Sequence, residues 1–186
     1  MPLLATARLL LVPATATALR ADLQSPQALA AILKVNLPAA WPPDLFNAAA
    51  ISWTLDSLES GRFTPDWGSY YITRKAEDGR RPLLIGVGGF KGSPTDGAVE
   101  LGYEIAPEVR RQGFALEAVE EWTRWAFTHG AVERVLAHTL TTLTPSISVL
   151  ERAGFAFAGL GNDPDEAEAV QSAISRAEHV ARTAPL

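Results

Sequence analysis

The first third of the chain carries apolar residues at helical spacing, preceded by one short strand. Residues 8–13 read Arg-Leu-Leu-Leu-Val-Pro, which predicts a strand that ends at the proline. Residues 14–35 are rich in alanine and leucine. They predict helix divided at Ser25, because serine caps a helix and the proline after it suits a first turn. Residues 45–60 place apolar side chains on one helical face and predict a further helix.

The middle of the chain changes to a strand pattern. Residues 68–75, 82–91 and 98–105 predict three strands from their apolar, aromatic and β-branched content. Short turn segments separate them, among them Asp78-Gly79, which is a hairpin signal. Three consecutive strands with short links predict an antiparallel meander.

The last third alternates between helices and strands. The pattern predicts a helix over 113–129, a strand over 133–140, a short helix over 145–153 and a short strand over 155–158. Residues 163–182 are acidic and alanine-rich, and predict a C-terminal helix. Added to the meander, this order predicts an α/β (α+β) fold.

Composition narrows the class of protein. The 186 residues fit a single domain, 1–186, with no internal repeat or linker. The net charge of -5 gives no general electrostatic case for nucleic acid as a partner, although local cations and N–H groups can still hold an anion. The absence of cysteine excludes disulfides and a cysteine acyl-enzyme. There is no long apolar stretch and no signal-peptide pattern, so we expect a cytoplasmic protein that does not enter a membrane.

A basic, glycine-containing segment lies where a predicted strand gives way to a predicted helix. Residues 110–115 read Arg-Arg-Gln-Gly-Phe-Ala. The start of a helix presents free N–H groups and a partial positive charge, and small residues there let a pyrophosphate approach the backbone. Arg110 and Arg111 add positive charge. The segment predicts a phosphate cradle, without the lysine that a P-loop requires.

A second glycine cluster, at residues 86–91, does not indicate a nucleotide fold. It reads Gly-Val-Gly-Gly-Phe-Lys, with lysine where a dinucleotide fingerprint needs its last glycine, and a turn follows it instead of a helix. A strand bulge or a close approach of two backbones is the better interpretation of these glycines.

Several blocks, taken in order, resemble one family. The segment from Arg110 to Ala115 matches the Arg/Gln-x-x-Gly-x-Gly/Ala acyl-CoA loop of the GCN5-related N-acetyltransferase (GNAT) superfamily. The wider pattern resembles the branch that contains the ribosomal-protein alanine N-acetyltransferases. The blocks that carry the wider resemblance are residues 6–11, 89–92, 99–103, 113–118 and 146–155.

The resemblance implies a fold, a co-substrate and a reaction. The fold is the GNAT fold, a mixed and mostly antiparallel sheet of six or seven strands flanked by helices, with a core over 6–159 and an atypical helical extension over 163–182. The co-substrate is acetyl-CoA, and no metal takes part. The reaction is acetyl transfer to a primary amine, either a protein N-terminus or a small molecule, by direct attack in a ternary complex.

The same resemblance implies which residues hold acetyl-CoA. Backbone groups near the end of the third meander strand pair with the pantetheine, and one N–H near Ile105 polarises the thioester carbonyl. N–H groups of the glycine segment hold the pyrophosphate. The implied binding residues are Glu104, Ile105, Ala106, Arg110, Arg111, Gln112, Gly113, Phe114 and Ala115.

Two residues resemble the family's catalytic groups. Glu100 corresponds to the candidate base, acting through water, and a solvated strand carboxylate is the alternative interpretation. Ser146 corresponds to the residue that hydrogen-bonds the CoA sulfur and protonates the leaving thiolate, and a helix-start serine is the alternative. Glu117 is best explained as a favourable first-turn carboxylate, although it could face the acceptor.

Aromatic residues supply the candidates for acceptor binding. Trp41 lies in a proline-rich loop that covers the acceptor in this fold, so it is either a pocket wall or a loop anchor. Tyr103 is the other candidate, and Tyr70 and Tyr71 could also reach the cleft, because the register of the strands is not determined by the sequence.

Other features leave questions open. The three histidines, His129, His138 and His179, lack ligand-like spacing, so no metal site is expected. Leu143 stands where the family usually has asparagine, and Leu150 where many members have a tyrosine acid. The alternative function is therefore a catalytically weak acyl-CoA-binding or sensing module, and a misread nucleotide-binding protein is a third possibility. The expected assembly is a monomer or a homodimer.

Overall fold

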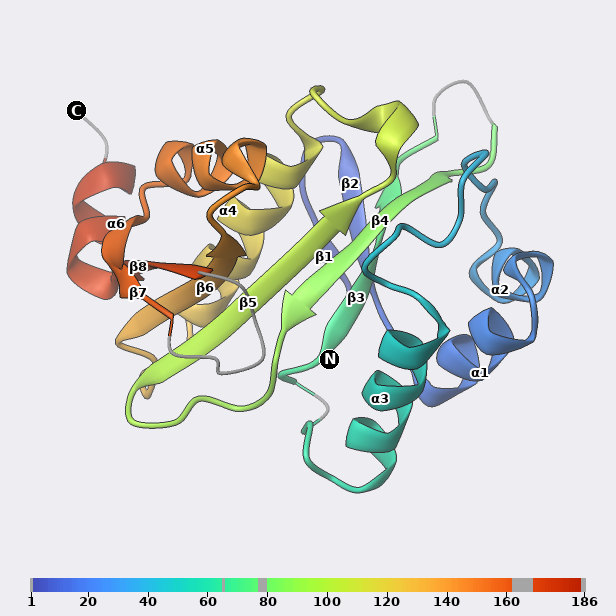
Figure 1. Cartoon of the computed structure of the whole chain (residues 1–186), viewed down its shortest axis with the longest axis horizontal. Helices are drawn as coiled ribbons and strands as arrows, with labels where there is room; N and C mark the ends of the chain where they lie inside the picture. The colour runs from blue at the N-terminus through green and yellow to red at the C-terminus, as the bar shows by residue number, and fades with distance from the viewer. Residues whose placement is uncertain (1, 65, 77–79, 162–168, 185–186) are drawn as a thin grey trace.

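The computed structural model of the chain describes residues 2–64, 66–76, 80–161 and 169–184. These residues form a sheet in the order β1-β2-β3-β4-β5-β6-β8-β7, with helices on both faces (Figure 1). The strands are β1 (Leu4–Ala5), β2 (Leu9–Pro13), β3 (Ser69–Arg74), β4 (Leu83–Phe90), β5 (Ala98–Ile105), β6 (Arg134–Leu140), β7 (Ala156–Leu160) and β8 (Ala169–Ser175). The helices are α1 (Ala16–Gln24), α2 (Pro26–Leu33), α3 (Ala48–Glu59), α4 (Phe114–Ala126), α5 (Thr144–Arg152) and α6 (Arg176–Thr183), with a short 3-10 turn, η1 (Pro107–Val109).

The first arm of the sheet, β1 to β5, consists of consecutive antiparallel neighbours. The predicted meander is confirmed, and its third strand has the predicted bounds, 98–105. The predicted turn at Asp78-Gly79 lies outside the described residues. The division of the first helical segment at Ser25 is also confirmed, because the Ser25 side chain accepts a hydrogen bond from Ala28 N at 3.1 Å and Pro26 opens α2.

The second arm contains the strands β6, β8 and β7. Strand β6 runs parallel to β5, and β8 lies between β6 and β7, antiparallel to both. The prediction of one helix over 163–182 is wrong for 169–175, because that segment is β8, and α6 forms only the part from Arg176 onward. The sheet consequently has eight strands, if the two-residue β1 is counted, instead of six or seven. Strand β8 forms there because it gains a hydrogen-bonding neighbour on each side, which outweighs its modest strand propensity.

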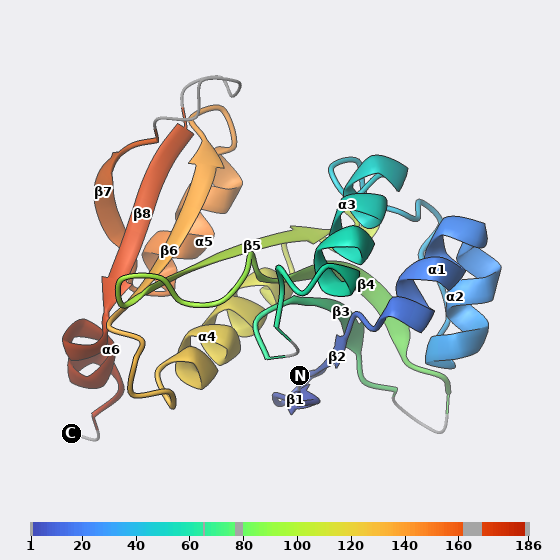
Figure 2. The ribbon, with the colours of Figure 1, turned by 90° about the horizontal axis from the view of Figure 1, so that it is seen from below.

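Two hydrophobic cores lie on the two faces of the first arm. Figure 2 shows α3 above β3 to β5 and α4 below them. The α4 core contains Trp122, with no exposed surface, and the inward residues of β5, Val99 and Leu101. The other core packs α1, α2 and α3 against the opposite face, around Tyr71. Because side chains alternate along a strand, consecutive residues of β3, and likewise of β5, point to opposite faces of the sheet.

The glycines of β4 permit a close approach of strand and helix. A Cβ at Gly88 would stand 2.6 Å from Trp122 Cη2 and 2.7 Å from the carbonyl oxygen of Gly102. At Gly86 it would stand 2.3 Å from the carbonyl oxygen of Glu104. The interpretation of this cluster as a close backbone approach is therefore confirmed, and it brings β5 against β4 at the position where the site is built.

Candidate active site

The sheet opens between β5 and β6. These strands pair only over Ala98–Glu100 and Arg134–Leu136, although β5 continues to Ile105 and β6 to Leu140. Each strand remains paired on its other side, β5 with β4 and β6 with β8. In Figure 2 the second arm turns away from β5 beyond this junction. We call this opening the fork; its two edges are residues 101–105 and 137–140.

The antiparallel ladder determines which peptide groups of β5 face the fork. Lys91 N donates to Glu100 O at 2.9 Å, and Ala106 N donates to Ile85 O at 2.9 Å, so the even-numbered residues of β5 bond to β4. The groups of Tyr103 and Ile105 therefore point toward the fork. The peptide groups of Glu104 and Ala106, for which the resemblance implies pantetheine contacts, are instead directed toward β4.

The predicted phosphate segment forms a tight turn before α4. Arg111 and Gly113 have φ of 62° and 80°, in the left-handed region, and Gly113 is the N-cap of α4. No side chain caps this helix, and within the described chain the N–H groups of residues 111–116 have no hydrogen-bond acceptor. Free N–H groups at a helix start form an anion-binding site. Gln112 is exposed here, Ala115 is partly buried, and Phe114 is buried in the α4 core.

Arg8, at the start of β2, clamps this turn. Its Nη1 donates to Gln112 O at 2.9 Å, its guanidinium lies 4.6 Å from the centre of the Phe114 ring, and its Nε is 2.6 Å from Glu117 Oε2. Glu117 also accepts from Thr6 Oγ1 and from Arg8 N. Burial raises the pKa of Glu117, but these hydrogen bonds and the charge of Arg8 outweigh burial and hold it below its usual value. Glu117 is thus a structural first-turn carboxylate, and its contact with Arg8, 109 residues earlier, has no local signal in the sequence.

Arg110 is directed back toward β5. Its Nε donates to Ile105 O at 2.7 Å, and its Nη2 lies 3.8 Å from Glu104 Oε1. Arg111, by contrast, is exposed and forms no ion pair within the described residues. Arg110 therefore braces the end of β5, and Arg111 is the arginine of this turn that has no such partner among the described residues.

Ser146 and Tyr103 meet across the fork. Ser146 lies in the first turn of α5, and its Oγ donates to Tyr103 Oη at 2.9 Å, while Tyr103 Oη donates to Ser146 O at 3.1 Å. Burial raises the pKa of Tyr103 to about 12, so its phenol is protonated near neutral pH. The helix begins after Leu143, which provides no side-chain cap. Two hydroxyl groups from opposite arms therefore stand together at one end of the fork.

Glu100 lies at the junction of the arms, on the face opposite α4. Its Oε1 is 2.6 Å from Lys91 Nζ and 3.1 Å from His138 Nδ1. His138 belongs to β6, and its Nε2 is 3.2 Å from Gln171 Nε2 of β8. Sequence reasoning selected Glu100 but missed its two partners, because the β5–β6 register that joins them cannot be read from periodicity.

Glu104 holds the loop before α3 against β5. Its carboxylate accepts from Leu45 N at 3.0 Å and from Phe46 N at 3.1 Å. Burial raises the pKa of Glu104, even though these backbone hydrogen bonds lower it. Glu108 accepts from Ala40 N at 2.9 Å in the same loop. The loop over residues 34–47 is thereby tied to the open end of the fork.

Trp41 is an anchor of this loop. Its Nε1 donates to Asp22 Oδ1 at 3.0 Å, and Tyr71 Oη donates to Asp22 Oδ2 at 2.9 Å. Asp22 belongs to α1 and faces Tyr71 of β3, and burial raises the pKa of its carboxyl group. Tyr71 and Tyr70 have no exposed surface, so they do not line a cleft. The polar edge of Trp41 thus faces the second core, and the structure supports the anchor interpretation.

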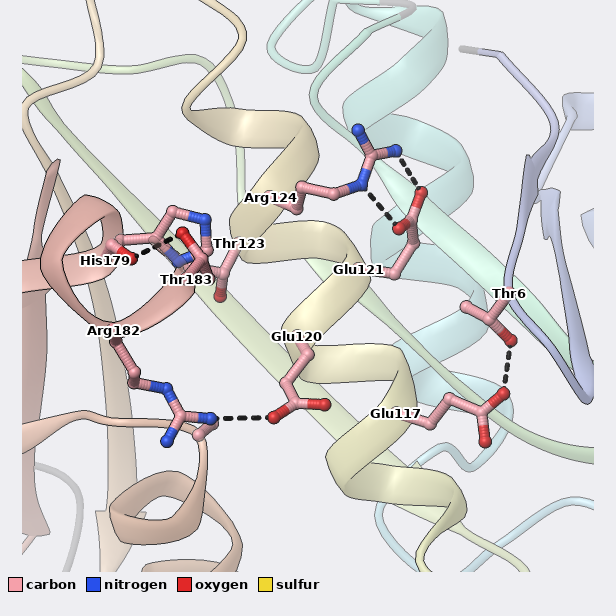
Figure 3. A pocket seen from close by; sticks show the side chains of 10 residues that line it. Thr6, Glu117, Glu120, Glu121, Thr123, Arg124, His179, Arg182 and Thr183 are labelled. Carbon is pink, nitrogen blue, oxygen red and sulfur yellow. Dashed lines mark hydrogen bonds and ion pairs between the residues drawn. The ribbon is translucent and has the colours of Figure 1, made fainter. Parts of the chain in front are cut away.

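A separate pocket of about 490 Å³ lies on the outer face of α4, beside α6 (Figure 3). Its charged groups are paired with one another: Glu120 with Arg182 at 2.8 Å, and Glu121 with Arg124 at 2.6 Å. It lies on the far side of α4 from Glu100 and is no part of the fork. Among the described residues there is no group of three or more His, Asp or Glu side chains that could hold a metal ion. No described helix has the length and apolarity needed to span a membrane.

This geometry defines a class of protein. A sheet that opens between two parallel strands, with free N–H groups at the start of the helix after one strand and a pair of hydroxyl groups across the opening, can hold an extended, phosphate-bearing ligand. The chain belongs to the GNAT acetyltransferase family, because residues 8–156 match the family described as Acetyltransferase (GNAT) domain. Family membership makes it an acetyltransferase that takes its acetyl group from acetyl-CoA.

Individual relatives agree with this assignment. The uncharacterized N-acetyltransferase YjdG of Bacillus subtilis (strain 168) is 29% identical over 117 residues, which cover 62% of this chain and 66% of YjdG, slightly less than two thirds of its length. RimL, a ribosomal L7/L12 alpha-N-protein acetyltransferase in complex with coenzyme A, superposes with a TM-score of 0.62 at 15% identity, covering 93% of this chain and 97% of RimL. The microcin C7 self immunity acetyltransferase MccE, in complex with acetyl-CoA and AMP, gives 0.62 at 13% identity, covering 91% and 93%. At these identities the two structures show a common fold.

Proposed function

We propose that the protein transfers the acetyl group directly from acetyl-CoA to a primary amine while both substrates are bound. The observation that carries this proposal is the fork, which has unpaired strand edges along its length, free N–H groups at the start of α4 and the Ser146–Tyr103 hydroxyl pair across it. An added chain can pair with the free edges as a strand would. Holding both substrates in one opening supplies much of the rate enhancement of such a reaction.

The groups around the fork have distinct roles in this proposal. N–H groups at the start of α4, with Arg111, bind the pyrophosphate. Ser146 and Tyr103 are the hydroxyl donors for the sulfur of the leaving thiolate. The N–H of Ile105, which points toward the fork, polarises the thioester carbonyl. Acetyl-CoA supplies the activated acyl group, and these residues orient it.

The acceptor enters on the face of β5 that carries Glu100 and Glu104. Their carboxylates lie on this face, Glu100 beside Lys91 and Glu104 beside Arg110, and the loop over 34–47 borders it. A carboxylate can bind an ammonium group through a charge-assisted hydrogen bond. The acceptor class is therefore a cationic primary amine, either a protein N-terminus or a small molecule. RimL is a ribosomal L7/L12 alpha-N-protein acetyltransferase, which supports the first of these two.

The test is thiol release from acetyl-CoA with a panel of small primary amines and of peptides with free N-termini. Each peptide has a matched control that is already acetylated at its N-terminus. We expect turnover with at least one free amine and none with its acetylated control. Calorimetric binding of CoA without turnover on the whole panel would instead identify an acyl-CoA-binding module, and competition by ATP equal to that by CoA would identify a nucleotide-binding protein.

A further inference from the structure

The carboxylate expected to take the proton from the amine is bound to two other groups. Glu100 Oε1 contacts both Lys91 Nζ and His138 Nδ1, at 2.6 and 3.1 Å. Protonation of Glu100 would break its ion pair with Lys91, whereas passing the proton to His138 would preserve that pair. A proton that arrives at Glu100 therefore has a nearby destination.

The backbone brings these groups together at the vertex of the fork. Glu100 is the last residue of β5 in the parallel ladder, opposite Leu136, and His138 is two residues further along β6. Residues two apart on a strand share a face, so His138 lies on the same face of the sheet as Glu100. The side chains of Glu100 and His138 are 28% and 26% exposed, which leaves this pair open to solvent and to an acceptor.

Gln171 allows the imidazole to change its protonation state. Its amide nitrogen is 3.2 Å from His138 Nε2, and the two residues are paired in the β6–β8 ladder. A glutamine amide can present either its N–H or its oxygen after rotation about its terminal bond. It can therefore donate to a bare Nε2 or accept from a protonated one. Gln171 can therefore stay hydrogen-bonded to His138 Nε2 whether the imidazole is neutral or charged.

We propose that His138 is the terminal acceptor of the proton that the attacking amine loses, and that Glu100 relays the proton to it. This inference rests on the proposed function. The ammonium gives one proton to the Glu100 carboxylate, which passes it to His138 Nδ1, and the imidazolium later releases it to solvent. The neutral amine then forms the C–N bond as the C–S bond breaks, and the second amine proton goes to the thiolate. Each turnover therefore yields one amide, one thiol and one proton released to solvent.

The groups that face His138 set the pH behaviour of the relay. Glu100 of β5 contacts its inner nitrogen, the uncharged Gln171 of β8 contacts its outer nitrogen, and Lys91 is the cation on the far side of Glu100. Within the described residues these are its charged and hydrogen-bonding partners. Because the relay passes the proton through an imidazole, we expect kcat/KM of the wild-type protein to depend on pH and this dependence to change when the imidazole is removed.

The experiment measures kcat, KM for acetyl-CoA and kcat/KM against pH for the wild-type protein and for H138Q, with H179Q as the matched control. His179 lies on α6, in the pocket on the other side of α4. We expect H138Q to lower kcat roughly 100-fold, to keep the KM for acetyl-CoA, and to change the pH dependence of kcat/KM. We expect H179Q to behave as the wild type.

A second variant separates proton transfer from positioning. In H138G, added imidazole is expected to restore turnover in proportion to its neutral form, with circular dichroism and CoA affinity reporting that the fold is retained. A loss of rate without imidazole rescue and with an unchanged pH profile would overturn the relay. Wild-type kcat and a wild-type profile in H138Q would also overturn it, while acetyl transfer itself stood. If the wild-type protein acetylated no amine, the proposed function and the relay would fail together.

Discussion

The two arms of the sheet are built in different ways, and the site lies at their junction. In the first arm, each strand pairs with the next strand along the chain from β1 to β5. In the second arm, β8 inserts between β6 and β7, so each of its pairings depends on a distant segment. Only three residue pairs of ladder join the arms. The first arm carries the turn proposed to bind the phosphates, and the second carries His138 and the Ser146 helix.

In the proposed mechanism, the division of the sheet into two arms separates binding of the acetyl donor from proton transfer. The N–H groups at the start of α4 belong to the first arm and are held by Arg8, whereas Ser146 and His138 approach from the second. Changes in the first arm should therefore act on CoA affinity, and changes at the contacts between arms should act on turnover. The variants below test this division, from the largest expected effect to the smallest.

Gly113→Glu should abolish measurable CoA binding. The glycine has φ of 80°, which disfavours any side chain, and a Cβ would stand 3.3 Å from Arg8 Nη2. The new carboxylate would occupy and repel the phosphate position. We expect a loss of at least about 100-fold in affinity by calorimetry, because the charged contacts at a helix start would be reversed. Gly130→Glu is the matched control, because no atom lies within 4 Å of a Cβ there. Unchanged affinity in Gly113→Glu would remove the phosphate assignment.

Ser146→Ala should lower kcat about 100-fold, and Tyr103→Phe about tenfold, with little change in CoA affinity. Ser146 lies in the first turn of α5 and loses its hydroxyl group in the first variant. Tyr103→Phe removes only the phenol hydroxyl and keeps the packing of the ring. Single-turnover thiol release measures both. A wild-type kcat in Ser146→Ala would exclude it as the donor to the thiolate, and a larger effect in Tyr103→Phe would make the phenol the principal donor.

Gly88→Ala should destabilise the fold by about 1–3 kcal/mol through overpacking. The added methyl group would be 2.6 Å from Trp122 Cη2 and 2.7 Å from the backbone of Gly102, so β5 or α4 would have to shift. Urea unfolding measures the difference, and Gly130→Ala provides the comparison at an open position. Equal stability of the two variants would show that the β4–β5 approach tolerates a side chain.

Glu117→Gln should destabilise the protein by about 1–2 kcal/mol at pH 7, because it weakens charge-assisted hydrogen bonds to Arg8 and Thr6. The pKa of Glu117 is lowered in the folded state. Its stabilising contribution is therefore present above its unfolded pKa and is lost as the pH falls through the folded pKa. Denaturant titrations at several pH values should show wild type and variant converging in acid. A difference that stayed constant with pH would contradict this account of the clamp.

The sequence predicts the first arm well because its signals are local. The turn residues, the alternation in 98–105 and the serine before Pro26 each act within a few residues. Strand β8 was missed because its seven residues gain stability from two distant neighbours. One local signal was available there: Ser175 and Glu178 form a capping box, which places the start of the last helix at Arg176.

The residues of the site fall into the same two groups, those that the sequence indicates and those that meet only in the folded chain. The glycine turn could be selected from its own residues, and Glu100 and Ser146 from the resemblance of their sequence blocks to the family. His138 and Lys91 could not, because they meet Glu100 only through the register of β5 with β4 and β6. The sequence leaves Trp41 as either a pocket wall or a loop anchor, because its hydrogen bond to Asp22 of α1 is not evident from the sequence.

The most direct test of the central claim is a crystal structure of the protein with CoA and the amine found by the panel. We predict the pantetheine between residues 101–105 of β5 and 137–140 of β6, the pyrophosphate at the start of α4, and the sulfur beside Ser146. We predict the amine nitrogen on the face that carries Glu100 and His138. CoA bound instead in the pocket between α4 and α6, or an amine on the α4 face of the sheet, would contradict the account.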